Sequence, residues 1–212
     1  TDWIADVMIA PDSVILSTRP ASVSIPSVRL RTHSGCSRLR FDLFTAIVLG
    51  VAGMRVPLSA QGTIVTDSVS SPGLASNVVG DTPVRRTLVY LPPSYQRDST
   101  RRYPVLYLLH GATSVPEEWL DGSYQGFDLR IAMDSLVAAR AVPELIVVMP
   151  NAANALGAGF YANSAATGNW EAFVVQDLVR HVDRRYRTDA RASKRALVGH
   201  SMGGFGAFNI GF

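Results

Sequence analysis

The segment Ala196–Phe208, which reads A-L-V-G-H-S-M-G-G-F-G-A-F, constrains the fold of this chain more than any other. Its first three residues form a short apolar run that is typical of a buried strand. Glycines stand two positions before and after Ser201, at Gly199 and Gly203, as a tight strand-to-helix turn requires. The pattern predicts an exposed Ser201 hydroxyl beside the Met202 amide, which could stabilise an oxyanion. The alternative is a glycine-rich turn whose serine takes no part in chemistry.

A second backbone donor is expected after an earlier strand. The continuous apolar run Val105–Leu109 is typical of a central strand that is covered on both faces. The residues that follow it, His110 to Thr113, form a short loop at the carboxyl end of that strand. We expect the Ala112 amide to point toward the same place as the Met202 amide, because a loop of this kind supplies the second donor of an oxyanion hole. An ordinary turn that ends a strand is the alternative.

The fold class follows from the order of the remaining patterns. We expect strands at residues 85–91 and 145–149, a helix at 129–139 and a longer helix at 170–186, whose apolar residues recur at helical spacing. Residues 61–81 are expected to lead into the first strands. This alternation predicts an α/β fold with a mostly parallel sheet and helices on both faces.

Ligands of such sheets bind at the carboxyl ends of the strands. Ala112, Ser201 and the long loop at residues 152–169 would meet there, and long loops often carry binding contacts. Within and after this loop, Tyr161 and Trp170 are candidate substrate contacts. For Trp170, a place in the core is the competing interpretation.

The first 60 residues are expected to lie outside this fold. Residues 1–37 show no sustained period and receive neither a fold nor a function. In residues 38–60, Arg38 and Arg40 precede an uncharged apolar run from Leu43 to Met54. The run is too short to span a bilayer, but it is typical of a secretory signal with cleavage after Ala60. We therefore expect a secreted or periplasmic protein, against the alternative of a buried or membrane-surface helix.

Composition excludes several classes of function. Six of the 20 basic and four of the 17 acidic side chains fall within residues 1–60, so the rest of the chain is nearly neutral. It contains no basic patch interleaved with aromatic residues, and we expect no nucleic-acid partner. Cys36 is the only cysteine, so neither a disulfide nor a cysteine metal site is expected. The glycines of the Ser201 segment do not supply the G-x-G-x-x-G of a dinucleotide site.

Several ordered motifs together carry a family resemblance. These are V-Y-L-P-P-S-Y, Y-P-V-L-Y-L-L-H-G, the F-Y and W-E-A-F segments, D-L-V-R-H-V-D-R-R-Y and G-H-S-M-G-G-F-G-A. From about Arg85 to the end, the chain resembles the putative-esterase group of α/β-hydrolases, which includes feruloyl esterases, enterochelin esterases, S-formylglutathione hydrolases and mycolyltransferases. The resemblance implies that Ser201 is the nucleophile, that Ala112 and Met202 form the oxyanion hole, and that no metal or organic cofactor takes part.

The sequence departs from the family where the rest of the triad should be. In this fold the acid and the histidine follow the serine in the chain, yet the eleven residues after Ser201 contain neither. The histidines present, His33, His110, His181 and His200, all precede Ser201, and none fits the role of base. We therefore expect residues 61–212 to form the N-terminal part of a hydrolase domain that lacks its C-terminal part, and to be essentially inactive alone.

For the intact protein, the resemblance implies a serine ester hydrolase that acts through an acyl-enzyme on a small-molecule or carbohydrate ester. The expected export favours a feruloyl or acetyl ester of a plant polysaccharide over cytosolic S-formylglutathione. Two alternatives remain: an acyltransferase of the mycolyltransferase type, and a hydrolase-like binding protein without catalytic activity.

Overall fold

The computed structural model describes residues 61–212. The predicted leader at residues 1–37 and the predicted signal peptide at residues 38–60 lie outside the described residues, as do His33 and Cys36. None of the helices within residues 61–212 has the length and apolar character needed to cross a membrane.

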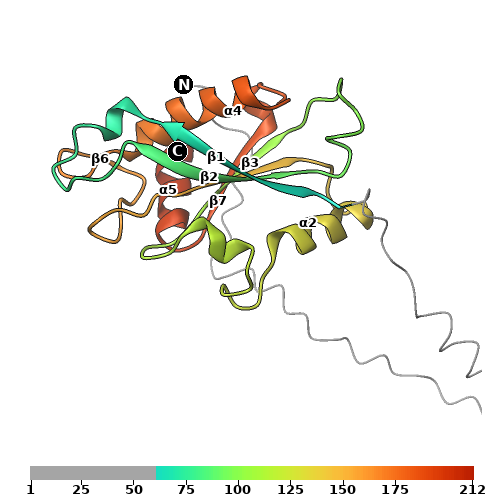
Figure 1. Cartoon of the computed structure of the whole chain (residues 1–212), viewed down its shortest axis with the longest axis horizontal. Helices are drawn as coiled ribbons and strands as arrows, with labels where there is room; N and C mark the ends of the chain where they lie inside the picture. Colours follow the sequence, from blue (N-terminus) through green and yellow to red (C-terminus); the bar gives the residue numbers. More distant parts are fainter. Residues whose placement is uncertain (1–60) are drawn as a thin grey trace, which may run out of the picture. The chain divides into compact units, whose positions relative to one another are not determined.

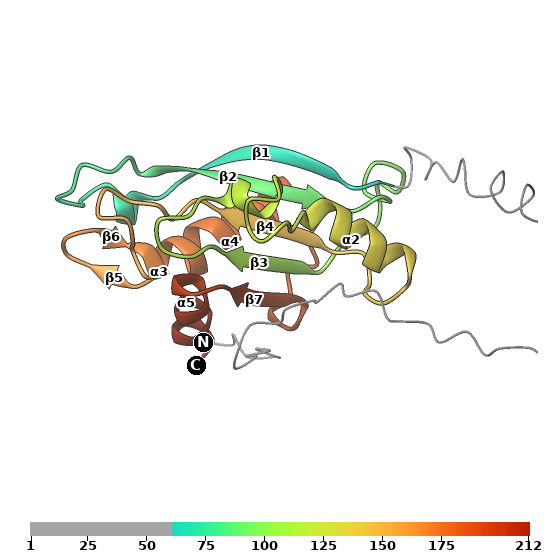
Figure 2. The ribbon, with the colours of Figure 1, turned by 90° about the horizontal axis from the view of Figure 1, so that it is seen from below.

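A five-stranded sheet forms the centre of the described region, in the order β1-β2-β4-β3-β7 (Figure 2). Its strands are β1 (Thr63–Ser70), β2 (Val84–Leu91), β3 (Val105–Leu109), β4 (Ile146–Pro150) and β7 (Arg195–Gly199). The strands that were predicted from apolar runs are all present. A small hairpin of β5 (Asn163–Ser164) and β6 (Gly168–Asn169) lies in the long loop between β4 and the helical region that begins at Trp170.

The sheet is mixed, so the prediction of a mostly parallel sheet was wrong in this respect. Strand β3 pairs in parallel with both β4 and β7, whereas β2 pairs antiparallel with both β1 and β4. The reason lies in the connections. Only one turn of 3-10 helix, η2 (Pro72–Leu74), lies between β1 and β2, and parallel neighbours need a longer crossover, usually a helix.

Both faces of the sheet are covered, as the sequence predicted. On one face, η3 (Pro116–Trp119) and α2 (Leu129–Ala138) pack on alternate strand residues such as Tyr90 and Leu108. On the other face, α3 (Trp170–Ala172), η4 (Phe173–Leu178) and α4 (Val179–Arg185) pack on Val89 and Leu109. Figure 1 shows α2 and α4 on opposite sides of the strands. The period of two residues along each strand thus divides its side chains between two cores.

The helix predicted at residues 170–186 is present, but its middle is not α-helical. Residues Phe173–Leu178 form η4, a π-helical segment between α3 and α4. The apolar stripe survives this change, since Phe173, Val174 and Leu178 are all fully buried.

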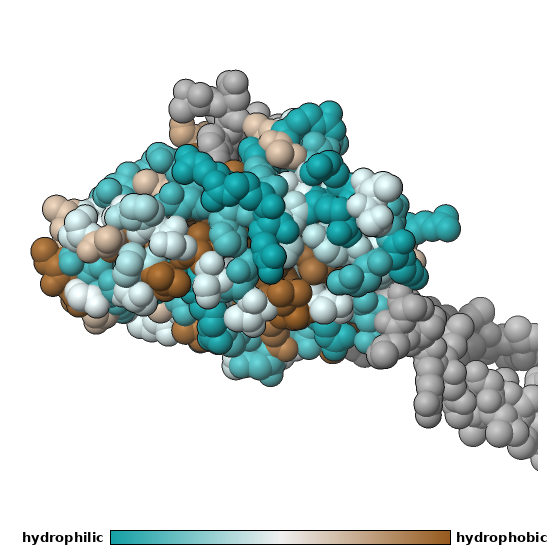
Figure 3. All heavy atoms as spheres, turned by 45° about the horizontal axis from the view of Figure 1, so that its top comes forward, coloured by the Kyte–Doolittle hydropathy of each residue, from teal (hydrophilic) through white to brown (hydrophobic). Residues whose placement is uncertain are grey.

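The face that carries α4 is mainly hydrophilic. Figure 3 shows apolar residues there in small groups and not as a continuous band. The last helix, α5 (Met202–Gly211), exposes Phe205 and Phe208.

Candidate active site

Ser201 stands at a sharp turn between β7 and α5. Its backbone has a φ of 53° and a ψ of −116°, a conformation that side-chain-bearing residues rarely adopt. The residue is exposed, and no residue of the described region forms a hydrogen bond with its hydroxyl. Strained residues of this kind persist where the surrounding structure holds them in place, and they concentrate at functional sites.

The two flanking glycines make this turn possible. A Cβ atom at Gly199 would lie 2.2 Å from the carbonyl of Gly203, and a Cβ atom at Gly203 would lie 2.1 Å from the carbonyl oxygen of Leu109 in β3. Neither position can therefore carry a side chain without movement of the backbone. The spacing of the motif reflects this close approach of α5 to β7 and β3.

The loop that follows β3 lies next to Ser201. A Cβ atom at Gly111 would be only 3.5 Å from Ser201 Cβ, and the His200 amide donates a hydrogen bond of 3.2 Å to the Leu109 carbonyl. Together these segments form a cavity of about 200 Å³, which is lined by residues 111–114, Glu118, Tyr124, His200 and Ser201. The structure thus brings together the two loops that the sequence predicted to meet.

Two backbone amides near this cavity are available to a ligand. Ala112 lines the cavity, and Met202 is the first residue of α5. Within residues 61–212, neither the Ala112 amide nor the Met202 amide donates a hydrogen bond. Free N–H groups at the start of a helix favour negative charge.

His110 holds the loop in shape and is not a candidate base. Its Nε2 accepts a hydrogen bond of 2.8 Å from the Ala152 amide, so its Nδ1 carries the proton and donates to the Gly111 carbonyl at 2.8 Å. Burial lowers the pKa of His110. The side chain is therefore neutral and fully bonded, and it connects the loop after β3 to the loop after β4.

The other described histidines are also not placed to activate Ser201. His181 Nε2 lies 2.9 Å from Asp67 Oδ2 in β1, the edge strand at the far side of the sheet from β7. His200 packs edge-to-face on Tyr124, with ring centroids 5.0 Å apart. In the part of the chain that the structure describes, no histidine is hydrogen-bonded to the Ser201 hydroxyl.

Burial of Tyr161 and Trp170 contradicts the expected substrate contacts. Both side chains are fully buried. The Tyr161 hydroxyl donates to the His110 carbonyl at 3.1 Å, and the Trp170 indole donates to the Thr167 carbonyl at 2.8 Å. The Trp170 ring also lies 5.0 Å from the guanidinium of Arg85. Both residues therefore support the loops around the site, and for Trp170 the competing interpretation as a core residue is confirmed.

Sequence reasoning missed Glu118 and Tyr124 as residues of the cavity. Tyr124 lies in a loop, with its ring centroid 4.8 Å from that of Trp119. Glu118 belongs to the short helix η3 and accepts a hydrogen bond of 2.6 Å from Ser114. Neither residue belongs to a periodic pattern, so no signal in the sequence separated it from an ordinary surface residue.

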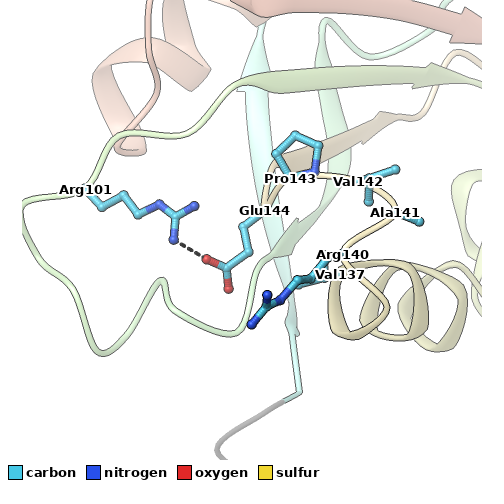
Figure 4. A pocket seen from close by; sticks show the side chains of 7 residues that line it. All are labelled: Arg101, Val137, Arg140, Ala141, Val142, Pro143 and Glu144. Atoms are coloured by element: carbon cyan, nitrogen blue, oxygen red, sulfur yellow. Dashed lines mark hydrogen bonds and ion pairs between the residues drawn. The ribbon is translucent and has the colours of Figure 1, made fainter.

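A larger cavity lies at the opposite end of the sheet and lacks the features of a reaction site. Its volume is about 520 Å³, and it is formed by Val137 and residues 140–144 together with Arg101. Figure 4 shows Arg101 paired with Glu144 across it. These residues precede β3 and β4, whereas Ser201 and Ala112 follow strands of the same sheet. No group of three or more metal-ligating side chains occurs among residues 61–212.

The model of the family described as "Putative esterase" matches residues 82–211, which is more than half of the chain. This chain belongs to the putative esterase family. The matched region includes the loop after β3, the Ser201 turn and the whole of α5.

Three curated relatives are similar to more than half of this chain. An esterase of Mycobacterium tuberculosis is 37% identical over 123 residues, which cover 56% of this chain and 24% of that protein. An endo-1,4-beta-xylanase/feruloyl esterase of Xylanibacter ruminicola is 34% identical over 122 residues, which cover 55% of this chain and 16% of that protein. An S-formylglutathione hydrolase of Arabidopsis thaliana is 32% identical over 129 residues, which cover 58% of this chain and 44% of that protein.

Solved structures agree with the fold. A ferulic acid esterase superposes with a TM-score of 0.61 at 32% identity, covering 70% of this chain and 53% of that protein. An S-formylglutathione hydrolase from Agrobacterium tumefaciens superposes with a TM-score of 0.52 at 25% identity, covering 71% of this chain and 53% of that protein. The fold is therefore that of the α/β-hydrolase esterases. The matched part of the chain spans about half the length of these two structures and less than half the length of the three curated relatives.

Proposed function

We propose that the full-length protein containing this chain is a serine carboxylic-ester hydrolase. Ser201 Oγ attacks the ester carbonyl, and the amides of Ala112 and Met202 bind the oxygen as it becomes negative. The alcohol then leaves, and water releases the acid from the acyl-enzyme. Each step transfers a proton to or from a general base, which in this family's fold is a histidine.

One observation carries this proposal. Ser201 is exposed at a strained turn beside a cavity that Ala112 also lines, and the amides of Ala112 and Met202 have no hydrogen-bond partner among residues 61–212. A donor that is fixed before the reaction costs no reorganisation when charge develops, and removing one such donor typically costs about 3 to 4 kcal/mol in the barrier.

The base is proposed to lie outside the described residues. His110 is neutral with both ring nitrogens bonded, and His181 is bonded to Asp67. Loss of the histidine from related triads lowers the rate many thousandfold. We therefore expect the 212-residue chain alone to be essentially inactive.

The proposed substrate is an extracytoplasmic ester, such as a feruloyl or acetyl ester of a polysaccharide. Two relatives support this choice by their names, the endo-1,4-beta-xylanase/feruloyl esterase and the ferulic acid esterase. The apolar run at residues 43–54, which is typical of a secretory signal, supports export.

Labelling with a fluorophosphonate tests the nucleophile. In the full-length protein, Ser201→Ala should abolish both labelling and hydrolysis of p-nitrophenyl acetate. Ser193→Ala is the matched control, because Ser193 is also exposed but belongs to the turn before β7. Equal labelling of Ser201→Ala and wild type would exclude Ser201 as the nucleophile. Capture of the acyl group by an added alcohol or sugar in preference to water would instead identify an acyltransferase.

A further inference from the structure

The cavity beside Ser201 carries one unbalanced negative charge. Glu118 contributes the only carboxylate among the lining residues, and neither lysine nor arginine lines the cavity. Its neighbour Glu117 differs, because that carboxylate forms an ion pair with Arg86 in β2. Across the described residues, Glu118 has no ion pair with a basic side chain.

The hydrogen bonding of Glu118 leaves one oxygen free for a ligand. Ser114 Oγ donates to Oε2 at 2.6 Å, which fixes the carboxylate against the loop that also carries Ala112. Among residues 61–212, no group donates to Oε1. A fixed carboxylate with a free oxygen accepts a hydrogen bond strongly, and it repels an anion.

An aromatic wall confines what enters the cavity. The Tyr124 ring packs against the rings of Trp119 and His200, with centroid distances of 4.8 Å and 5.0 Å. The Tyr124 hydroxyl forms no hydrogen bond with a described residue. A group that enters the cavity therefore meets an aromatic surface on one side and the carboxylate of Glu118 on another.

We propose that Glu118 determines specificity in this cavity: it accepts a hydrogen bond from an uncharged or cationic donor on the ester and excludes esters that place a carboxylate there. The proposal rests on the serine hydrolase function proposed above. It implies that the natural substrate bears a hydroxyl, amide or ammonium group on the part that occupies the cavity.

Two pairs of esters of matched shape test the proposal in the full-length protein. One pair varies the acyl part, as 4-nitrophenyl 4-carbamoylbenzoate and 4-nitrophenyl 4-carboxybenzoate. The other varies the alcohol part, as 4-carbamoylphenyl acetate and 4-carboxyphenyl acetate. For each ester, kcat/KM is divided by the rate of spontaneous hydrolysis of that ester. In the pair whose variable group enters the cavity, this normalised kcat/KM of wild type should be about tenfold higher for the carbamoyl ester than for the carboxy ester. That ratio corresponds to about 1.4 kcal/mol.

Glu118→Gln should bring this ratio close to one, whereas Glu117→Gln should leave it unchanged. The two variants remove the same charge from adjacent residues, but only Glu118 lines the cavity. A ratio is insensitive to any general effect of the substitution on the oxyanion. A ratio that Glu118→Gln leaves unchanged in both pairs would overturn the inference, while the esterase function would stand.

Wild type provides a second measurement, should Glu118→Gln fold poorly. The preference for the carbamoyl ester should weaken as NaCl is raised from 20 mM to 500 mM, because salt screens the carboxylate. The absence of any preference at low salt would also overturn the inference. A wild-type protein that hydrolyses none of the four esters, nor p-nitrophenyl acetate, would contradict the proposed function itself.

Discussion

Replacing Gly203 with alanine tests whether the close approach of α5 to β3 holds the Ser201 turn in place. The added methyl group would lie 2.1 Å from the Leu109 carbonyl oxygen, 2.6 Å from the Leu109 carbonyl carbon and 2.9 Å from the His110 carbonyl oxygen. All three atoms are backbone atoms, so no side-chain rotation can relieve the contact.

The size of the effect follows from these distances. Helix and strand must separate by roughly 1 Å before such a contact becomes tolerable, and overpacking of this kind costs about 3 kcal/mol in stability. The same separation stretches the hydrogen bond from the His200 amide to the Leu109 carbonyl. It also moves Ser201 relative to Ala112, and a shift of about 1 Å can lower the rate about 100-fold.

Gly204→Ala is the matched control. It lies in the same turn of α5, but its added methyl group would come no closer than 3.4 Å to the Gly199 carbonyl oxygen. Alanine is also favoured over glycine in a helix by roughly 0.5 to 1 kcal/mol. Urea unfolding compares the stability of the two variants, and hydrolysis of p-nitrophenyl acetate compares their activity in the full-length protein.

The reasoning fails if the free energies of unfolding of Gly203→Ala and Gly204→Ala agree within about 0.5 kcal/mol and the two variants have similar activity. That result would mean that α5 can shift away from β3 at little cost. The glycine spacing of the motif would then not be explained by backbone contact.

Three further predictions concern the residues that support the site. Burial lowers the pKa of His110 from 6.5, so the unfolded state binds a proton more readily than the folded state below about pH 6.5. The free energy of unfolding should therefore decrease as the pH is lowered below this value. His110→Gln should flatten this pH dependence in urea titrations. Arg85→Met should destabilise the protein by about 2 kcal/mol or more in thermal unfolding, because the buried guanidinium donates to the Thr82, Asn151 and Ala153 carbonyls. Tyr161→Phe should cost about 1 kcal/mol in stability and leave KM unchanged, since its hydroxyl bonds only the His110 carbonyl; a raised KM with unchanged stability would restore Tyr161 as a substrate contact.

Local patterns predicted most of the elements. The apolar run at β3 and the strand-glycine-serine sequence at residues 196–203 depend on short-range sterics and on burial of both sheet faces, which residue type alone reveals. The prediction that the Ala112 loop would lie beside Ser201 also succeeded, because neighbouring parallel strands end at the same edge of a sheet.

Features that depend on distant partners were not predictable in this way. The antiparallel pairing of β2 with β1 and β4 depends on which strands become neighbours, and the sequence does not state that order. Tyr161 occurs in a glycine-rich loop that is typical of a surface, yet its side chain packs directly against Gly206 of α5. A Cβ atom at Gly206 would lie only 2.7 Å from it. Its burial required knowledge of α5.

The sequence by itself determined the tight turn at Ser201 and the alternation of strands and helices, since both are encoded by neighbouring residues whose size and polarity restrict the backbone. Only the tertiary structure decided what surrounds Ser201. Glu118 and Tyr124 reach its cavity, His110 turns its ring toward Ala152, and Trp170 is enclosed, because each of these outcomes depends on contacts between segments far apart in the chain.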